Sequence, residues 1–264
     1  VIIGRVFIVL FGDNPLTAAK AVNIMSALAS AFTILFLFWT ITHFAKRILE
    51  TQSGTALTSN QIFLVMGAGV VGALAYTFSD SFWFSAVEGE VYAMSSLFTA
   101  AIFWMILKWD AEMISIKHGE IKDGRSPMRW MILIWFMFGL AIGVHLLGIL
   151  LVPAIGYVIY FRLWGEVKPK TFILTGLLSL IILAVIQEGV IPGTISMASS
   201  FEITFRNSFG LPFFAGTIFF FTVLIGVLIY VARYARKKGK TVLYNSLFGL
   251  IFLLIGHSIG CCMC

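Results

Sequence analysis

Long apolar runs separated by short polar segments dominate the sequence. A helix that spans a bilayer needs about 20 mostly apolar residues. Eight runs approach or exceed this length, at about 15–44, 61–78, 91–107, 130–145, 147–163, 171–187, 211–232 and 241–257. Residues 1–11 add a partial apolar segment before a Gly-Asp-Asn-Pro turn. The pattern predicts an all-α polytopic membrane protein with about eight transmembrane helices plus a partial N-terminal one, in a single transmembrane domain over 1–264.

The apolar run at 130–162 is too long for one membrane crossing. As a single helix it would measure about 50 Å, against about 30 Å for the hydrocarbon core of a bilayer. Gly143, Val144 and His145 offer a turn near its middle. We therefore expect two short antiparallel helices that meet at this turn.

Composition and charge support the membrane assignment. Hydrophobic residues make up 60% of the chain, charged residues 11%, and the mean hydropathy is +1.00, which excludes an ordinary soluble domain. The net charge is +6, but 15 of the 18 Lys and Arg residues fall at 45–60, 108–129, 162–170 and 233–240. The positive-inside rule predicts cytoplasmic loops there and outer loops at about 79–90 and 187–212. Lysines and arginines in short loops do not indicate nucleic-acid binding.

Residues 67–72 match the dinucleotide-binding pattern Gly-x-Gly-x-x-Gly. That pattern binds a nucleotide only in a turn between a strand and a helix. Here it lies inside an apolar span, where small residues allow helices to approach closely. We expect Gly67, Gly69 and Gly72 to pack against a neighbouring helix.

The outer segment at 79–92 combines aromatic and acidic residues. Phe82, Trp83 and Phe84 are typical of a membrane interface. Glu88 and Glu90 directly precede an apolar helix, where carboxylates are able to cap the helix N-terminus. The alternative is that they belong to a polar substrate site, because ionisable groups near membrane depth are costly and usually functional. Both interpretations stay open at this point.

Other polar residues fall on the same predicted face. His145 ends a short span, Arg5 lies near the same leaflet, and Asp80 and Tyr92 flank the acidic segment. We expect an outward-facing polar cavity with Glu88 and Glu90 as catalytic residues, and with substrate-binding residues Arg5, Asp80, Tyr92 and His145.

The remaining polar features carry less information. The connection at 187–212 is either a plain loop or contains a short interfacial helix or lid, and His43 is expected to be solvated. Cys261, Cys262 and Cys264 offer neither a disulfide framework nor metal-ligand spacing. We predict no metal site and no cofactor.

Three stretches resemble one membrane family. They are residues 22–31, residues 80–92 and the Gly-Val-His-Leu-Leu sequence at 143–147. They are similar to the bacterial membrane family once called domain of unknown function 2723, which is grouped with the transmembrane protein 260-like O-mannosyltransferases, glycosyltransferase family 117. The resemblance extends over residues 1 to about 256.

The resemblance implies a GT-C-like bundle and a membrane glycosyltransferase in the bacterial inner membrane. Such enzymes pass a sugar, mannose among them, from a polyprenyl-phosphate carrier to a protein hydroxyl on the extracytoplasmic face. The implied partners are this donor, a protein acceptor and membrane lipid. In the family, an acidic motif in the first outer loop precedes the position of Val1. We therefore expect this chain to be a fragment that lacks its principal base and, by itself, is inactive.

Two other classes of function fit the composition. A secondary transporter would use acidic residues as ion or substrate sites, but such proteins often contain internal repeats and mid-span charges. No clear repeat is present, and most ionisable residues lie at span ends. A non-catalytic membrane scaffold is the third class, for which the small-residue helices would suffice.

Overall fold

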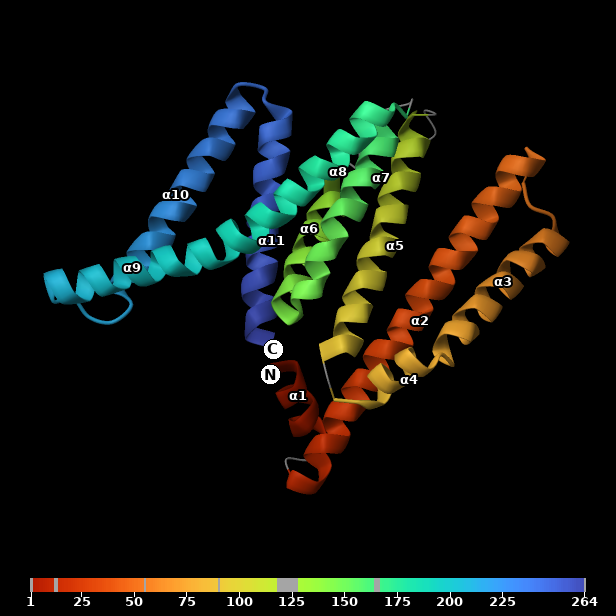
Figure 1. The fold of residues 1–264 in the computed structure, drawn as a ribbon, viewed down its shortest axis with the longest axis horizontal. Coiled ribbons are helices and arrows are strands. Elements are labelled where there is room, and N and C mark those ends of the chain that lie inside the picture. The colour runs from red at the N-terminus through yellow and green to blue at the C-terminus, as the bar shows by residue number, and fades with distance from the viewer. Residues whose placement is uncertain are drawn as a thin grey trace. The chain divides into compact units, whose positions relative to one another are not determined.

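The computed structural model describes residues 2–11, 14–54, 56–89, 91–117, 128–163 and 167–263 (Figure 1). Over these residues all regular structure is helical. The elements are α1 (Ile2–Leu10), α2 (Pro15–Ser53), α3 (Ser59–Thr77), α4 (Asp80–Val87), α5 (Val91–Lys117), α6 (Met128–Val144), η1 (Leu146–Leu150), α7 (Leu151–Leu163), α8 (Pro169–Ala184), η2 (Val185–Val190), α9 (Ile191–Phe209), α10 (Ala215–Lys237) and α11 (Thr241–Met263).

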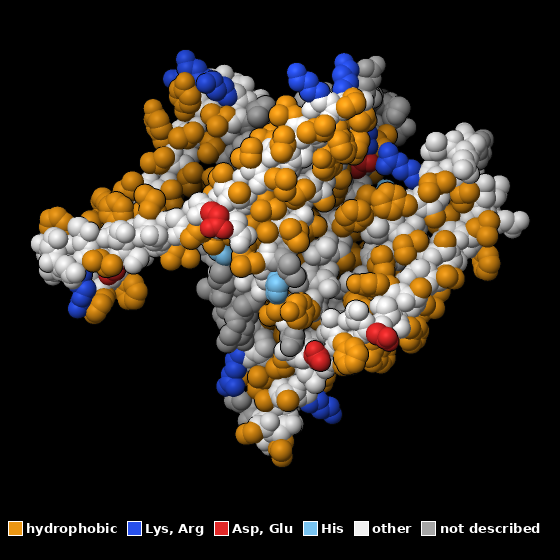
Figure 2. Space-filling view, viewed as in Figure 1, with side chains coloured by type: hydrophobic (Ala, Val, Ile, Leu, Met, Phe, Trp, Pro, Cys, Tyr) orange, Lys and Arg blue, Asp and Glu red, His pale blue; other side chains and the backbone are white. Residues whose placement is uncertain are grey.

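The helices confirm an all-α polytopic membrane fold. Within the described chain, five are long and apolar enough to cross a bilayer: Pro15–Gln52, Ser59–Thr77, Val91–Ile116, Pro169–Phe209 and Ala215–Lys237. Three shorter apolar helices occupy the positions of the other expected spans. Figure 2 shows hydrophobic side chains over most of the visible helix surfaces, with most charged side chains near helix ends.

The chain forms two compact units, each described here by itself. The first unit contains Val1–Gly148 and Phe252–Cys264, and the second contains Ile149–Ile251. Helix α11 therefore contributes residues to both units. All of the predicted site residues belong to the first unit.

Helix α2 organises the first unit and packs against α1, α3, α4 and α5. It begins with Pro15 at its first position, and the Asn14 side chain accepts a hydrogen bond from the amide of Leu16 at 3.1 Å. It ends at Gly54, which has φ 63°. The expected end near residue 44 was wrong, since the helix continues to Ser53 and is 39 residues long. At about 58 Å it is longer than a bilayer core is thick.

Helix α3 packs closely on α2 through two of its glycines. A Cβ atom at Gly69 would lie 2.5 Å from a side-chain carbon of Thr42, and one at Gly72 would lie 2.6 Å from Ile41. The packing prediction is thus confirmed for these two residues. It was wrong for Gly67, because no described atom outside its own helix lies within 4 Å of a Cβ built there.

The long apolar run at 130–162 is divided where the sequence predicts. Helix α6 ends at Val144, and a short 3₁₀ helix, η1, precedes α7. Within the first unit, α6 packs on the C-terminal part of α11, because a side chain at Gly139 would overlap the backbone of Leu253. His145 lies at the break between α6 and η1, and its amide donates a hydrogen bond to the carbonyl of Ala141 at 2.9 Å.

In the second unit, most of the outer loop expected at 187–212 is helical. Helices α8, η2 and α9 form one helical stretch over Pro169–Phe209, so only a short connection precedes α10. The polar residues of α9 suggested a loop, but Phe201 and Phe205 lie on one face and contact Phe219 of α10, with ring centroids 5.8 and 5.0 Å apart. Aromatic packing stabilises this segment as a helix.

Candidate functional site

Five of the six predicted site residues are described: Arg5 lies in α1, Asp80 in α4, Glu88 directly after α4, Tyr92 in the first turn of α5 and His145 directly after α6. Figure 1 shows these segments at the same end of the first unit. Helices α1 and α4 both pack against α2, and α4 also contacts α3 and α5. Helix α2 therefore supports the acidic segment from one side.

Helix α4 is short and is anchored by one aromatic side chain. Phe82 is only 5% exposed, and its ring lies 4.6 Å from that of Tyr76 on α3. Trp83 and Phe84 are exposed, as the interface prediction requires for this segment. The buried Phe82 holds the helix while its two ends remain accessible.

The two ends of α4 carry the carboxylates of Asp80 and Glu88. Both residues are exposed. Neither side chain hydrogen-bonds to, or forms an ion pair with, any residue that the structure describes. Asp80 lies in the first turn of α4, where the helix dipole favours a negative charge.

Glu88 is extended, with φ −93° and ψ 140°, and its amide bonds to the carbonyl of Phe84 at 3.1 Å. The capping interpretation requires its carboxylate to accept a backbone N–H of the next helix. Among the described residues no such bond forms. Glu90 lies outside the described residues.

Close packing at Gly89 determines where Glu88 lies. A Cβ atom at Gly89 would lie 2.9 Å from Val22 Cγ1 and 3.1 Å from Asn23 Oδ1, both on α2. The glycine therefore lets the chain between α4 and α5 approach α2 more closely than any other residue would allow. This approach places Glu88 beside the N-terminal half of α2.

Tyr92 and His145, far apart in the sequence, are in contact. Their ring centroids are 5.4 Å apart at an interplanar angle of 40°. Tyr92 is 47% exposed, and His145 is half-buried. The contact joins the first turn of α5 to the break after α6, which puts a phenol and an imidazole at the same end of the unit as Glu88.

Arg5 is exposed on α1. Helix α1 packs on α2, so Arg5 lies on a helix that contacts the same helix as α4 does. In the described part of the chain, no group of three or more His, Cys, Asp or Glu side chains has the arrangement of a metal site. This end of the unit therefore carries two exposed carboxylates, an imidazole, a phenol and a guanidinium.

The other end of the unit contains ionic contacts that sequence reasoning missed. Arg47 on α2 bonds to Asp110 on α5 at 2.8 Å. Glu112 accepts two bonds from Arg129 at 3.1 Å and one from Trp130 Nε1 at 2.5 Å. Asp110 and Glu112 lie inside the predicted basic loop at 108–129, and acidic residues among basic ones were the feature of the sequence that indicates such ion pairs.

His43 also corrects an expectation at this end. Its Nε2 atom is buried and has no hydrogen-bond partner among the described residues, whereas the sequence suggested a solvated side chain. Trp39, His43, Lys46 and Glu50 are spaced by three or four residues and so lie on one face of α2. This spacing could have been recognised from the sequence alone.

Comparison with known proteins gives one family. The family model described as the protein O-mannosyl-transferase TMEM260 N-terminal domain matches residues 1–168. No curated protein and no solved structure matches the chain. The matched residues include all six of the predicted site residues.

Proposed function

Because the chain belongs to the family of the protein O-mannosyl-transferase TMEM260 N-terminal domain, we propose that it is the membrane part of a GT-C type glycosyltransferase. The donor is a sugar on a polyprenyl-phosphate carrier, and the acceptor is a protein hydroxyl. Transfer takes place at the extracytoplasmic face of a bacterial inner membrane. The family membership and the multi-pass helical fold support this assignment.

One observation carries the proposed site. Glu88 is an exposed carboxylate that no described residue engages. It is adjacent to the tightly packed Gly89, and it precedes Tyr92, which contacts His145, by four residues in the chain. A carboxylate without a hydrogen-bond or ion-pair partner among the described residues is available to bind substrate.

The chemistry assigns a role to each residue. The acceptor oxygen forms a bond to the anomeric carbon of the sugar, and the bond from that carbon to the carrier phosphate breaks through an oxocarbenium-like state. Glu88 or Glu90 orients the acceptor hydroxyl or takes its proton. His145 or Arg5 binds the departing phosphate, whose negative charge grows during transfer. Asp80 and Tyr92 bind polar groups of the substrates.

The test is a set of single substitutions in the full-length protein. Sugar transfer from a polyprenyl-phosphate donor to a protein acceptor is measured in liposomes for Glu88→Gln, Glu90→Gln and His145→Ala. Glu→Gln keeps the shape and removes the charge, so a residue that binds substrate or moves the proton is expected to lose about 10²-fold in transfer rate.

The matched control is Glu188→Gln, which removes an exposed carboxylate from η2 in the other unit. It is expected to transfer sugar at the normal rate. If Glu88→Gln, Glu90→Gln and His145→Ala all keep near-normal rates while remaining folded, the proposed site is wrong. A transporter or a non-catalytic scaffold then becomes the better explanation of the fold.

A further inference from the structure

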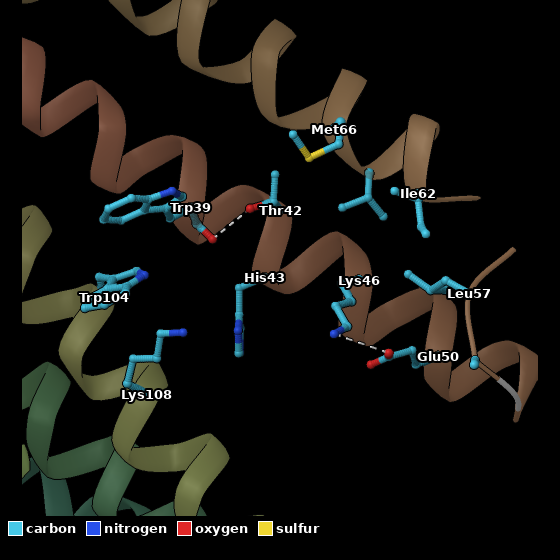
Figure 3. A pocket seen from close by; sticks show the side chains of 12 residues that line it. Trp39, Thr42, His43, Lys46, Glu50, Leu57, Ile62, Met66, Trp104 and Lys108 are labelled. Atoms are coloured by element: carbon cyan, nitrogen blue, oxygen red, sulfur yellow. Dashed lines mark hydrogen bonds and ion pairs between the residues drawn. The ribbon is translucent and has the colours of Figure 1, made fainter. Parts of the chain in front are cut away.

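A cavity of about 650 Å³ lies in the first unit between α2, α3 and α5, at the end that carries the Arg47–Asp110 ion pair. It is not part of the proposed transfer site, because none of its lining residues is one of the six candidates. Figure 3 shows that Trp39, His43, Lys46 and Glu50 come from α2, and Trp104 and Lys108 from α5. Its open side faces away from the protein core, as the exposure of Lys46 and Lys108 indicates.

The polar lining of the cavity carries a net positive charge. Two lysines and one glutamate line it, so the formal charge is +1 with His43 neutral. Lys46 lies 3.6 Å from Glu50. Lys108 has its ammonium 5.0 Å from the centre of the Trp104 ring and forms no ion pair with a described carboxylate. One cation therefore remains without a counter-charge.

The imidazole of His43 adds an unsatisfied polar atom. In the view of Figure 3 it lies between Lys108 and Lys46. Its buried Nε2 has no partner in the described chain, and burying a polar atom without a hydrogen bond is costly. A ligand with an anionic group in the cavity would give Lys108 a counter-charge, whereas the buried Nε2 of His43 is out of its reach.

The rest of the lining is apolar and aromatic. Ile62, Val65 and Met66 of α3 form one wall, and Trp39 and Trp104, with ring centroids 5.3 Å apart, form another. Trp104 lies near the middle of α5, four residues before Lys108, so this aromatic wall extends from the lysine into the apolar part of the helix. A ligand that fits both walls has an anionic head and an apolar chain.

We propose that this cavity binds the phosphate headgroup of an anionic membrane lipid. Lys108 and Lys46 bind the phosphodiester, whose single negative charge matches the +1 of the lining. The apolar side chains of α3 contact the first part of an acyl chain. Glu50 limits the affinity, because it shares Lys46 and repels the anion.

Native mass spectrometry of the full chain in detergent tests the proposal. The probes are phosphatidylglycerol, phosphatidylcholine and inorganic phosphate. We expect phosphatidylglycerol to bind more tightly than phosphatidylcholine. The double variant Lys46→Gln/Lys108→Gln is expected to lose at least about tenfold in affinity for phosphatidylglycerol. Glu50→Gln is expected to bind it more tightly than the unmodified chain, a gain that misfolding cannot produce.

The matched control is Lys237→Gln/Lys238→Gln, which removes the same charge from the end of α10 and is expected to change the affinity less than about twofold. Equal loss in both double variants, or no loss in Lys46→Gln/Lys108→Gln, would overturn the proposal. Equal binding of the two lipids would overturn the role of the net charge. If inorganic phosphate occupies the cavity as tightly as phosphatidylglycerol does, the ligand is a free anion and the lipid assignment fails.

Discussion

At the scale of single residues, three glutamates differ in what surrounds them. Glu88 is exposed and unengaged, whereas Glu112 is 9% exposed and accepts hydrogen bonds from Arg129 and Trp130. Glu202 accepts bonds from residues at the start of α10. Of these three, only Glu88 has a carboxylate that no described residue engages, which is why it, and not Glu112 or Glu202, is a candidate for the proposed transfer site.

Glu112→Ala is expected to destabilise the protein. It leaves the Trp130 N–H and the Arg129 guanidinium without their acceptor, a loss of about 1–3 kcal/mol for a partly buried charged group. The measurement is the thermal midpoint in detergent. Glu88→Ala is the control and is expected to leave the midpoint unchanged, and a midpoint lowered equally by both changes would contradict the distinction between them.

A second prediction at this scale uses two glycines of α3. Gly69→Val is expected to cost about 1–3 kcal/mol, because its side chain overlaps Thr42 and Phe38 of α2. Gly67→Val meets open space and is expected to be close to neutral. Thermal midpoints of the two variants provide the comparison, and a greater loss for Gly67→Val would show that α3 packs on α2 through another face.

At the scale of elements, the hairpin of α9 and α10 depends on a cap supplied by the preceding helix. The Glu202 carboxylate accepts the amides of Phe214 at 2.7 Å and Thr217 at 2.9 Å, and the Thr217 hydroxyl at 3.0 Å. Phe214 has φ 71° at the N-cap position, a conformation that non-glycine residues rarely adopt. The carboxylate therefore does what an N-cap side chain does in other helices.

Glu202→Ala is expected to loosen the start of α10 without unfolding the unit. Removing the cap frees two amides, so hydrogen exchange there should become roughly fivefold faster. Hydrogen–deuterium exchange of the peptide that contains Phe214 and Thr217 measures this. Glu188→Ala is the control and is expected to leave the exchange of this peptide unchanged. Unchanged exchange in Glu202→Ala as well would mean that α10 begins in the same way without the carboxylate.

At the scale of the whole molecule, the charge distribution predicts the orientation of the chain. The segments at 45–60, 108–129, 162–170 and 233–240, expected as loops, include the ends of α2, α5 and α10 in the structure. They hold 15 of the 18 basic residues and are proposed to lie on the cytoplasmic side. Helix α4, with the candidate carboxylates, is proposed to lie on the outer face. The proposed transfer at the extracytoplasmic face requires this orientation.

Labelling of single cysteines in intact cells tests this orientation. In a background without Cys261, Cys262 and Cys264, an impermeant maleimide is expected to label Ser81→Cys on α4. It is expected to label Lys238→Cys only after permeabilisation, because that residue belongs to a basic segment. Ready labelling of Lys238→Cys in intact cells would reverse the proposed topology.

The sequence by itself determined the membrane character, the order of the helices, the break at His145 and the family. These follow from local properties, since the length of an apolar run and a turn within it depend on neighbouring residues alone. The polar composition of α9 misled the same reasoning, because its helix is stabilised by rings of α10 that lie further along the chain.

Only the tertiary structure decided which side chains meet. The contact of Tyr92 with His145, the packing of Gly69 but not Gly67, and the buried nitrogen of His43 each depend on which face a helix turns to its neighbours. In a membrane helix the faces toward lipid and toward protein are similarly apolar, so the sequence pattern does not distinguish them. Close packing between helices distant in sequence determines which face of a helix turns toward the protein, and so determines the surroundings of Glu88.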